Sequence, residues 1–224
     1  MESTIKNCII NASNGNGWYP KGTRRLKRSL IEHGYSGDIL TWFDFPNDDF
    51  DKRNPYHVKA SAFTEAIKLG YTHILWLDCS VWAIGNPDKI FDVINESGYY
   101  FWSSGYNCAQ TCNDKCLDYF GIYRDEAEHY PDCSTSMFGV NLSNPTASQF
   151  IQEWLQSAHD GMFNGSRNHD GQSNDERFMF HRQDQSCASI ILNKLGMQIT
   201  PANIYSSYYS PKQNESVLFT MRGM

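Results

Sequence analysis

The chain has 224 residues, 40% of them hydrophobic, and a formal net charge of −6. This length suffices for one domain with a substantial core, and the acidic balance gives no sign of the positive field that a nucleic-acid surface needs. No apolar N-terminal leader is visible, and no window approaches the ~20 apolar residues of a membrane span. We therefore expect a cytoplasmic protein in which the seven cysteines are mostly reduced thiols.

Short apolar runs alternate with helical patterns along the chain, which indicates an α/β fold. The predicted strands cover 8–12, 39–43, 73–77, 99–103, 137–142 and 197–200. The predicted helices cover 23–33, 58–69, 87–96, 146–158 and 184–195. The polar stretch 160–176 is typical of a loop, and 201–224 shows no periodicity. The run 73–77 is continuously apolar, as expected for a central strand covered on both faces.

One carboxylate stands directly after this central strand, at Asp78. In open α/β sheets, ligands bind beyond the carboxyl ends of the strands. A carboxylate there can hold Mn²⁺ or Mg²⁺ against a diphosphate, and the hydroxyl of Ser80 points the same way and can add a ligand. The alternative is an aspartate that caps the turn after a strand. The pattern thus predicts a metal site at Asp78 and Ser80.

The segment 54–59, the helix that follows it and the run 70–80 together resemble the donor half of GT-A glycosyltransferases. The resemblance implies a single α/β domain over 1–224, with a central, mixed, mainly parallel sheet flanked by helices. It makes Asp78 the first acid of an Asp-x-Asp motif in which Ser80 replaces the second. The donor-binding residues that it implies are Asn11, Ala12, Ser13, Lys59, Asp78, Cys79 and Ser80.

A second resemblance covers 181–186, which is similar to the Asp-Gln helix start of small retaining transferases of the glycogenin and bacterial galactosyltransferase type. It implies that Asp184 faces the acceptor, or serves as general base if the enzyme inverts. Gln185 is then close to the reacting sugar carbon. Asp132 opens a small-residue strand similar to the one that lines the acceptor pocket, and is a further catalytic candidate. The alternative for Asp184 is a helix N-cap.

The two resemblances imply a donor-binding part at about 5–105, an acceptor-side part at about 106–200 and a tail at 201–224. The expected reaction moves a sugar from a nucleotide-diphosphate donor, with UDP as the expected nucleotide, to a glycan or another hydroxyl acceptor. The Asp-Gln pattern favours retention. No His follows His181 to complete a metal shell. A sugar-nucleotide-binding protein without activity therefore remains an alternative, and a nucleotidyltransferase on a related fold is another.

The series Cys108, Cys112 and Cys116 is the main competing signal. Spacing of four places the three thiols on one face of a predicted helix, and thiolates suit zinc or an iron–sulfur cluster. Tetrahedral sites usually take two cysteines from a tight turn, and no such pair is evident. The interpretation that we favour is therefore buried free thiols, which behave as small apolar residues.

Overall fold

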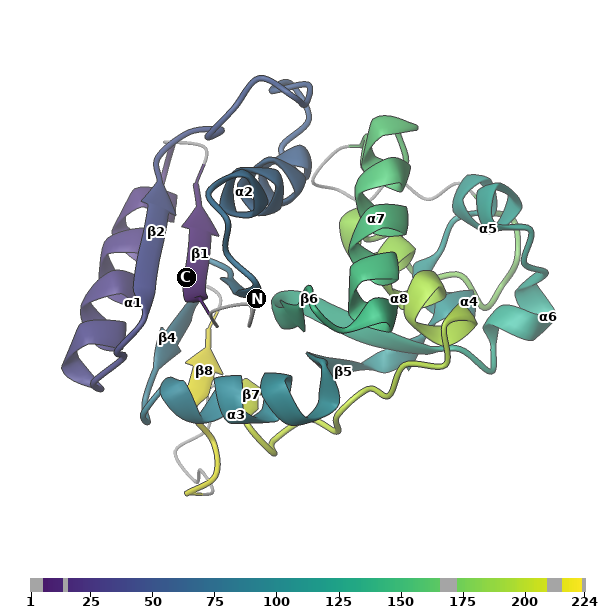
Figure 1. Ribbon diagram of the computed structural model, residues 1–224. Coiled ribbons are helices and arrows are strands. Elements are labelled where there is room, and N and C mark those ends of the chain that lie inside the picture. Colours follow the sequence, from purple (N-terminus) through teal and green to yellow (C-terminus); the bar gives the residue numbers. More distant parts are fainter. Residues whose placement is uncertain (1–5, 14–15, 166–172, 209–214, 223–224) are drawn as a thin grey trace.

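A computed structural model describes residues 6–13, 16–165, 173–208 and 215–222, built around a five-stranded sheet in the order β2-β1-β3-β6-β5 (Figure 1). Strand β1 pairs in parallel with β2 and β3, whereas β6 is antiparallel to both β3 and β5. The predicted mixed, mainly parallel sheet is thereby confirmed. The strands are β1 (Asn7–Ala12), β2 (Asp38–Trp42), β3 (His73–Leu77), β5 (Tyr99–Asn107) and β6 (Pro131–Asn141).

Helices cover both faces of this sheet, and β3 shows why. Successive side chains of a strand point to opposite faces. Ile74 and Trp76 join the core cluster shared with α2 (His57–Lys68), α7 (Pro145–His159) and α8 (Asp184–Lys194). Leu75 and Leu77 join the cluster shared with α1 (Tyr19–Glu32) and α3 (Asp88–Ser97). Figure 1 shows α7 and α8 on one side of β6 and α3 on the other.

Helix α1 begins at Tyr19, four residues before the predicted start at Thr23. Pro20 stands in its first turn, where the ring's fixed φ favours helix initiation. The Gly-rich composition of 13–22 predicted a loop across the whole segment. Gly22 is in fact a buried helical residue that packs against Cys79, because it has no Cβ to collide with the carbonyl oxygen of Cys79.

A second, three-stranded sheet has the order β4-β8-β7. Its strands are β4 (Val81–Ala83), β7 (Ser206–Tyr208) and β8 (Phe219–Met221), so the tail without periodicity at 201–224 contributes two strands. Three residues are too few to show an alternating pattern, so these strands have no recognisable sequence signal. The strand predicted at 197–200 is wrong, since only Thr200 forms a bridge there, to Trp102 of β5.

The segment between β5 and β6 folds into three short helices, α4 (Cys108–Thr111), α5 (Asp114–Phe120) and α6 (Arg124–Ala127). The expected single helix bearing three cysteines is wrong, because Asn113 interrupts it and caps α5 through a bond from Cys116 N at 2.9 Å. The expected burial of Cys108, Cys112 and Cys116 in the core is nevertheless confirmed. Among the described residues, no helix has both the length and the apolar character needed to cross a bilayer.

Candidate active site

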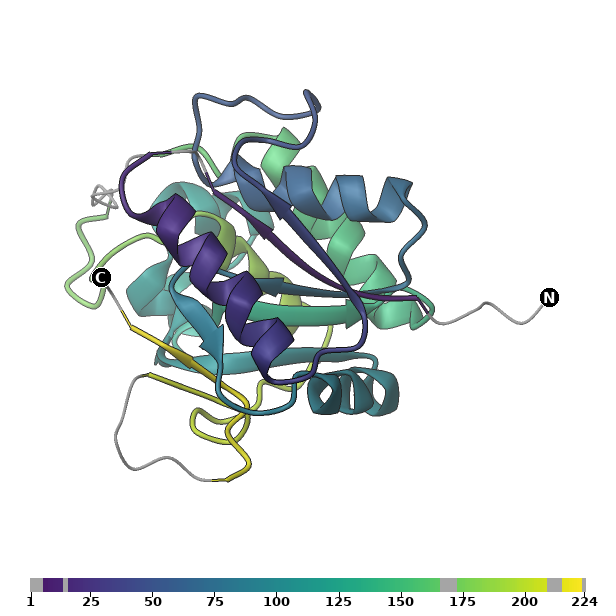
Figure 2. The same cartoon turned by 90° about the vertical axis from the view of Figure 1, so that its left-hand side faces the viewer.

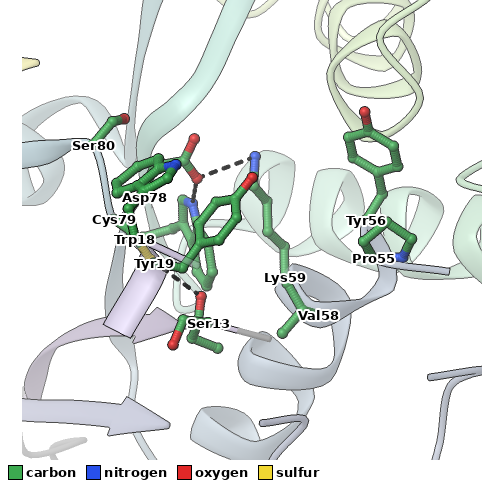
Figure 3. Close-up of a pocket in the computed structure, with 12 residues that line it drawn as sticks. Ser13, Trp18, Tyr19, Pro55, Tyr56, Val58, Lys59, Asp78, Cys79 and Ser80 are labelled. Carbon is green, nitrogen blue, oxygen red and sulfur yellow. Dashed lines mark hydrogen bonds and ion pairs between the residues drawn. The ribbon is translucent and has the colours of Figure 1, made fainter. Parts of the chain in front are cut away.

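A pocket of about 310 Å³ opens at the carboxyl ends of β1 and β3 (Figure 3). In Figure 2 the carboxyl end of β1 and the beginning of α1 lie on the left, the side toward which β8 also runs. Parallel strands of open α/β sheets place their ligands at this edge. Four segments line the pocket: Ala12 and Ser13; Trp18 and Tyr19; Pro55, Tyr56, Val58 and Lys59; and Trp76, Asp78, Cys79 and Ser80.

Lys59 lines the pocket and also contacts the buried residues Asp184 and Thr135. Its Nζ lies 2.8 Å from Asp184 Oδ2, 3.0 Å from the Thr135 carbonyl oxygen and 3.5 Å from Asp78 Oδ1. The Lys59 side chain is only 11% exposed. Burial by itself lowers the pKa of Lys59, but the charges of Asp184 and Asp78 outweigh it and the net pKa is raised. The ammonium is therefore a fixed positive charge at neutral pH.

Asp78 presents a carboxylate to the pocket with one oxygen already held. Its Oδ1 accepts a 2.7 Å bond from Trp76 Nε1, and its backbone N–H donates to Ser136 O at 2.8 Å. The side chain is 32% exposed, in contrast to the 3% of Asp184. Burial raises the pKa of Asp78, and the Lys59 ammonium opposes that shift. Of the two carboxylates bound to Lys59, Asp78 is the one that a ligand can reach.

The turn after Asp78 is fixed by Arg25 from helix α1. Its Nη2 donates to Cys79 O at 3.2 Å and to Ser80 O at 3.0 Å, while its guanidinium lies 4.2 Å from the centre of the Trp82 ring. These two bonds satisfy the carbonyl oxygens of Cys79 and Ser80. Arg25 thus holds the Asp78–Ser80 turn against helix α1.

Asn11, predicted as a donor contact, does not line the pocket. It is fully buried, where its Nδ2 donates to Leu77 O at 2.7 Å and its Oδ1 accepts from Thr23 Oγ1 at 2.8 Å. These bonds join β1 to β3 and to α1. Ala12 and Ser13, the other two candidates at this strand end, do line the pocket. At the end of β1, Ala12 and Ser13 thus line the pocket, and the hydrogen bonds of Asn11 hold this strand end in place.

Asp184 and Gln185 begin helix α8, directly after Gln183, whose φ of 39° is unusual for a residue other than glycine. Neither side chain lines the pocket. Asp184 Oδ2 accepts from Lys59 and, at 2.8 Å, from Thr135 Oγ1. The alternative role of Asp184 as N-cap is absent, since Asp184 is the first helical residue and no side-chain cap bond forms at Gln183. In this structure Asp184 acts on the pocket through Lys59.

Asp132 is fully buried and holds Gln185 in place. Gln185 Nε2 donates to Asp132 Oδ2 at 2.8 Å, and the hydroxyls of Ser104, Thr111 and Ser189 also donate to this carboxylate. Burial raises the pKa of Asp132 to about 6, despite the bonds from Ser104 and Ser189. Its geometry therefore fits a group that orients Gln185 rather than one that touches an acceptor.

The oxygen atoms at Asp78 fit a hard divalent cation. Asp78 Oδ2 accepts no bond from any described residue, and Ser80 lines the same pocket. Mg²⁺ commonly binds through one or two carboxylates plus substrate phosphates and retained waters. Within the described ranges, no three His, Cys, Asp or Glu side chains are grouped to hold a metal. A cation here would depend on a diphosphate for several of its ligands.

The sequence patterns did not single out Trp18, Tyr56 or Thr135. Trp18 and Tyr19 are stacked, with 4.6 Å between ring centres, and both line the pocket beside the end of β1. Two adjacent aromatic residues just before a predicted helix were a usable signal. No local sequence signal marks the contact of Thr135 with Lys59, because the two residues are 76 positions apart.

No protein-family model and no curated protein matches this sequence. Solved structures do match. A glycosyltransferase involved in glycosylation of the PBCV-1 major capsid aligns over 96% of this chain and 92% of its own, with TM-score 0.53 and 12% identity. Mouse xyloside xylosyltransferase 1 aligns over 98% of both chains, with TM-score 0.54 and 10% identity. The bifunctional glycosyltransferase WbbM aligns over 93% of this chain and 40% of its own, with TM-score 0.50 and 12% identity. The chain thus has a GT-A glycosyltransferase-like fold.

Proposed function

We propose that this chain is a glycosyltransferase that moves a sugar from a nucleotide-diphosphate donor, with UDP as the nucleotide, to a hydroxyl group of an acceptor. One observation carries the proposal: the Lys59–Asp78–Asp184 cluster lies at the pocket where β1 and β3 end. The likeness in fold to three glycosyltransferases supports it.

The aromatic side of the pocket suits the nucleoside. Trp18 and Tyr19 line the pocket together with Ala12 and Ser13, and Lys59 and Asp78 line the same pocket (Figure 3). Stacking of a base on an aromatic ring contributes about 1–3 kcal/mol. A base placed against Trp18 or Tyr19 would direct its diphosphate toward Lys59 and Asp78.

The reaction breaks the bond between the anomeric carbon and the diphosphate oxygen while the acceptor oxygen bonds to that carbon. The bonding electrons leave with the diphosphate, and the acceptor proton passes to a departing phosphate oxygen. Lys59 supplies a preorganised positive charge near the place where negative charge develops. This proton path leads to retention, which the Asp-Gln resemblance favours, and it leaves Asp184 to orient the Lys59 ammonium.

Asp78 and Ser80 are the residues that would hold Mn²⁺ or Mg²⁺. When bound, the cation neutralises charge on the departing diphosphate. Two carboxylates and one ammonium leave the cluster with one negative charge in excess, which favours a cation between it and an anionic donor.

A second candidate is a sugar-nucleotide-binding protein without activity. The observation in its favour is the burial of Asp184, whose carboxylate is tied to Lys59 and Thr135 and cannot accept an acceptor proton in this arrangement. Both candidates bind the nucleotide, so they differ in turnover alone.

Thermal shift with UDP, GDP and CMP, each with and without Mn²⁺, tests the shared donor site. A ligand that binds the native state raises the melting temperature by mass action. We expect metal-dependent stabilisation by UDP, and slow hydrolysis of one UDP-sugar in a screen of such donors. Asp184→Ala should retain UDP binding and lose hydrolysis. The absence of any nucleotide response rejects the proposal, and UDP binding without hydrolysis of any donor favours the second candidate.

A further inference from the structure

Two aromatic pairs stand on strand β5, outside the residues that line the pocket. The Tyr106 and Phe180 rings meet edge to face, 5.1 Å apart, and the Trp102 and Tyr208 rings lie 5.4 Å apart. Trp102 is buried, but Tyr106 is 38% exposed and Tyr208 is 55% exposed. Partly exposed aromatic rings form a platform that can pack against the C–H faces of a sugar ring.

Arg182 lies at this platform, and no acidic side chain among the described residues pairs with it. Its guanidinium is 4.9 Å from the centre of the Phe180 ring, and the side chain forms no ion pair with any carboxylate of the described residues. In a chain of net charge −6, an exposed arginine without an acid beside it is free to recruit an anion.

The position of Arg182 connects the platform to the pocket. Burial raises the pKa of Tyr208, and the charge of Arg182 opposes that shift. Burial likewise raises the pKa of Tyr56, to about 12, and Arg182 again opposes the shift. Tyr56 lines the pocket and Tyr208 belongs to the platform, so Arg182 lies within electrostatic reach of both.

We propose that Tyr106, Phe180, Tyr208 and Arg182 form an acceptor subsite for a sugar ring that carries an anionic substituent. The inference rests on the proposed glycosyl transfer and adds the class of acceptor. A guanidinium binds a carboxylate or phosphate through two parallel N–H···O bonds, which a neutral sugar cannot reproduce. Lys59 lines the pocket of the proposed donor, whereas Arg182 lies outside that lining and is available to a second ligand.

Saturation-transfer NMR on the full chain with UDP bound tests the subsite. The probes are methyl β-D-glucuronide, glucose 6-phosphate and the neutral methyl β-D-glucoside, at equal concentrations. We expect one or both anionic sugars to bind at least about tenfold more tightly than the glucoside, since bonds to charged groups are the stronger kind. Comparison of the glucuronide with glucose 6-phosphate shows whether the subsite prefers a carboxylate or a phosphate substituent.

Arg182→Gln should remove the preference for the anionic sugars, and Tyr208→Ala should weaken all sugar binding. Arg24→Gln is the matched control, because Arg24 is also exposed and its guanidinium lies 5.3 Å from the centre of the Phe43 ring. Arg24→Gln should leave the affinities for all three sugars unchanged. Equal binding of all three probes, no binding of any, or an undiminished preference in Arg182→Gln overturns the subsite.

Stabilisation by UDP separates this inference from the function on which it rests. Arg182→Gln should retain the UDP-induced shift in melting temperature, because Arg182 lies outside the pocket lining. If that shift disappears in Arg182→Gln alone, the arginine belongs to the donor site and the acceptor subsite is rejected. If the unaltered chain shows no UDP response, the proposed function itself fails.

Discussion

The ammonium of Lys59 lies 2.8 Å from Oδ2 of Asp184, a residue 125 positions further along the chain. Both side chains are almost fully buried, and the pair fastens helix α2 to the start of α8 beside the pocket. A buried ion pair adds little net stability compared with apolar residues of the same volume, but the loss of one partner leaves an uncompensated charge. The pair therefore makes Lys59 and Asp184 mutually dependent.

Lys59→Met should lower the free energy of unfolding by about 3–5 kcal/mol, because it leaves Asp184 buried without its counter-charge. The double variant Lys59→Met/Asp184→Asn should lose less than the sum of the two single changes. Lys68→Met is the control on the same helix, since Lys68 pairs with Asp49 at the surface and its loss should cost far less. Urea denaturation of the unaltered chain, the two single variants, the double variant and Lys68→Met measures these losses. Equal losses for Lys59→Met and Lys68→Met would show that the buried pair is not coupled.

Asp78→Asn should abolish metal-dependent UDP binding and leave the melting temperature of the unliganded protein nearly unchanged. The asparagine carbonyl can still accept the bond from Trp76, so the local structure persists. The lost charge is the part that a cation needs. Thermal shift with Mn²⁺ and UDP measures both quantities. A large loss of stability with UDP binding retained would assign Asp78 a structural role.

Ser80→Asp should tighten Mn²⁺-dependent UDP binding, because it adds a second carboxylate to the proposed metal site. A further charged oxygen ligand increases the affinity for a hard cation. Ser143→Asp adds the same charge in an exposed turn and is the control. Calorimetric titration of UDP at fixed Mn²⁺ gives the dissociation constants. Unchanged affinity in Ser80→Asp would exclude residue 80 from the metal site.

The sheet could be predicted from the sequence because its strands carry local signals. The uninterrupted run from Ile74 to Leu77 marks a strand with helices on both faces, and Asp78 follows it at the edge where ligands bind. Strands β4, β7 and β8 have three residues each and exist through pairing with distant segments. No local periodicity can reveal such pairing.

The candidate site was predictable to the extent that its residues adjoin strand ends. Ser13, Asp78 and Ser80 line the pocket as those positions suggested. The direction of a side chain is a different matter. Nothing in the spacing shows that Asp184 is turned to Lys59, or that Asp132 is turned to Gln185, since each contact joins segments more than fifty residues apart.

Gly22→Ala tests whether the close packing of α1 against the Asp78–Ser80 turn matters. A Cβ at residue 22 would lie 2.4 Å from the carbonyl oxygen of Cys79, which is backbone and cannot rotate away. Alanine in place of glycine in a helix gains up to about 1 kcal/mol, whereas overpacking a core costs about 1–3 kcal/mol. We expect a net loss of stability and weaker UDP binding by calorimetry. Lys27→Ala, on the exposed side of α1, should retain both. A more stable Gly22→Ala protein would show that the turn moves aside freely.

Asp132 should give the protein a characteristic dependence on pH. Burial raises its pKa to about 6 in the folded chain, against about 3.9 for an aspartate in an unfolded one. Between these values the folded state binds more protons than the unfolded state, so the free energy of unfolding falls as the pH rises from 4 to 6. The contribution is fully present below pH 4, is lost above pH 6 and amounts to about 3 kcal/mol.

Asp132→Asn should remove this part of the slope, because asparagine does not ionise. Urea denaturation at several pH values between 4 and 7 gives the free energy of unfolding for each protein. Asp92→Asn, an exposed position on α3, should keep the slope of the unaltered chain. The difference between the two variants isolates Asp132 from the surface carboxylates Asp51 and Asp175, whose ion pairs with Arg53 and Arg177 lower their pKa values and give a slope of the opposite sign. Identical slopes in Asp132→Asn and Asp92→Asn would mean that Asp132 ionises in the folded chain as it does in the unfolded one. Its bonds to Ser104, Thr111, Ser189 and Gln185 would then offset the whole cost of its burial.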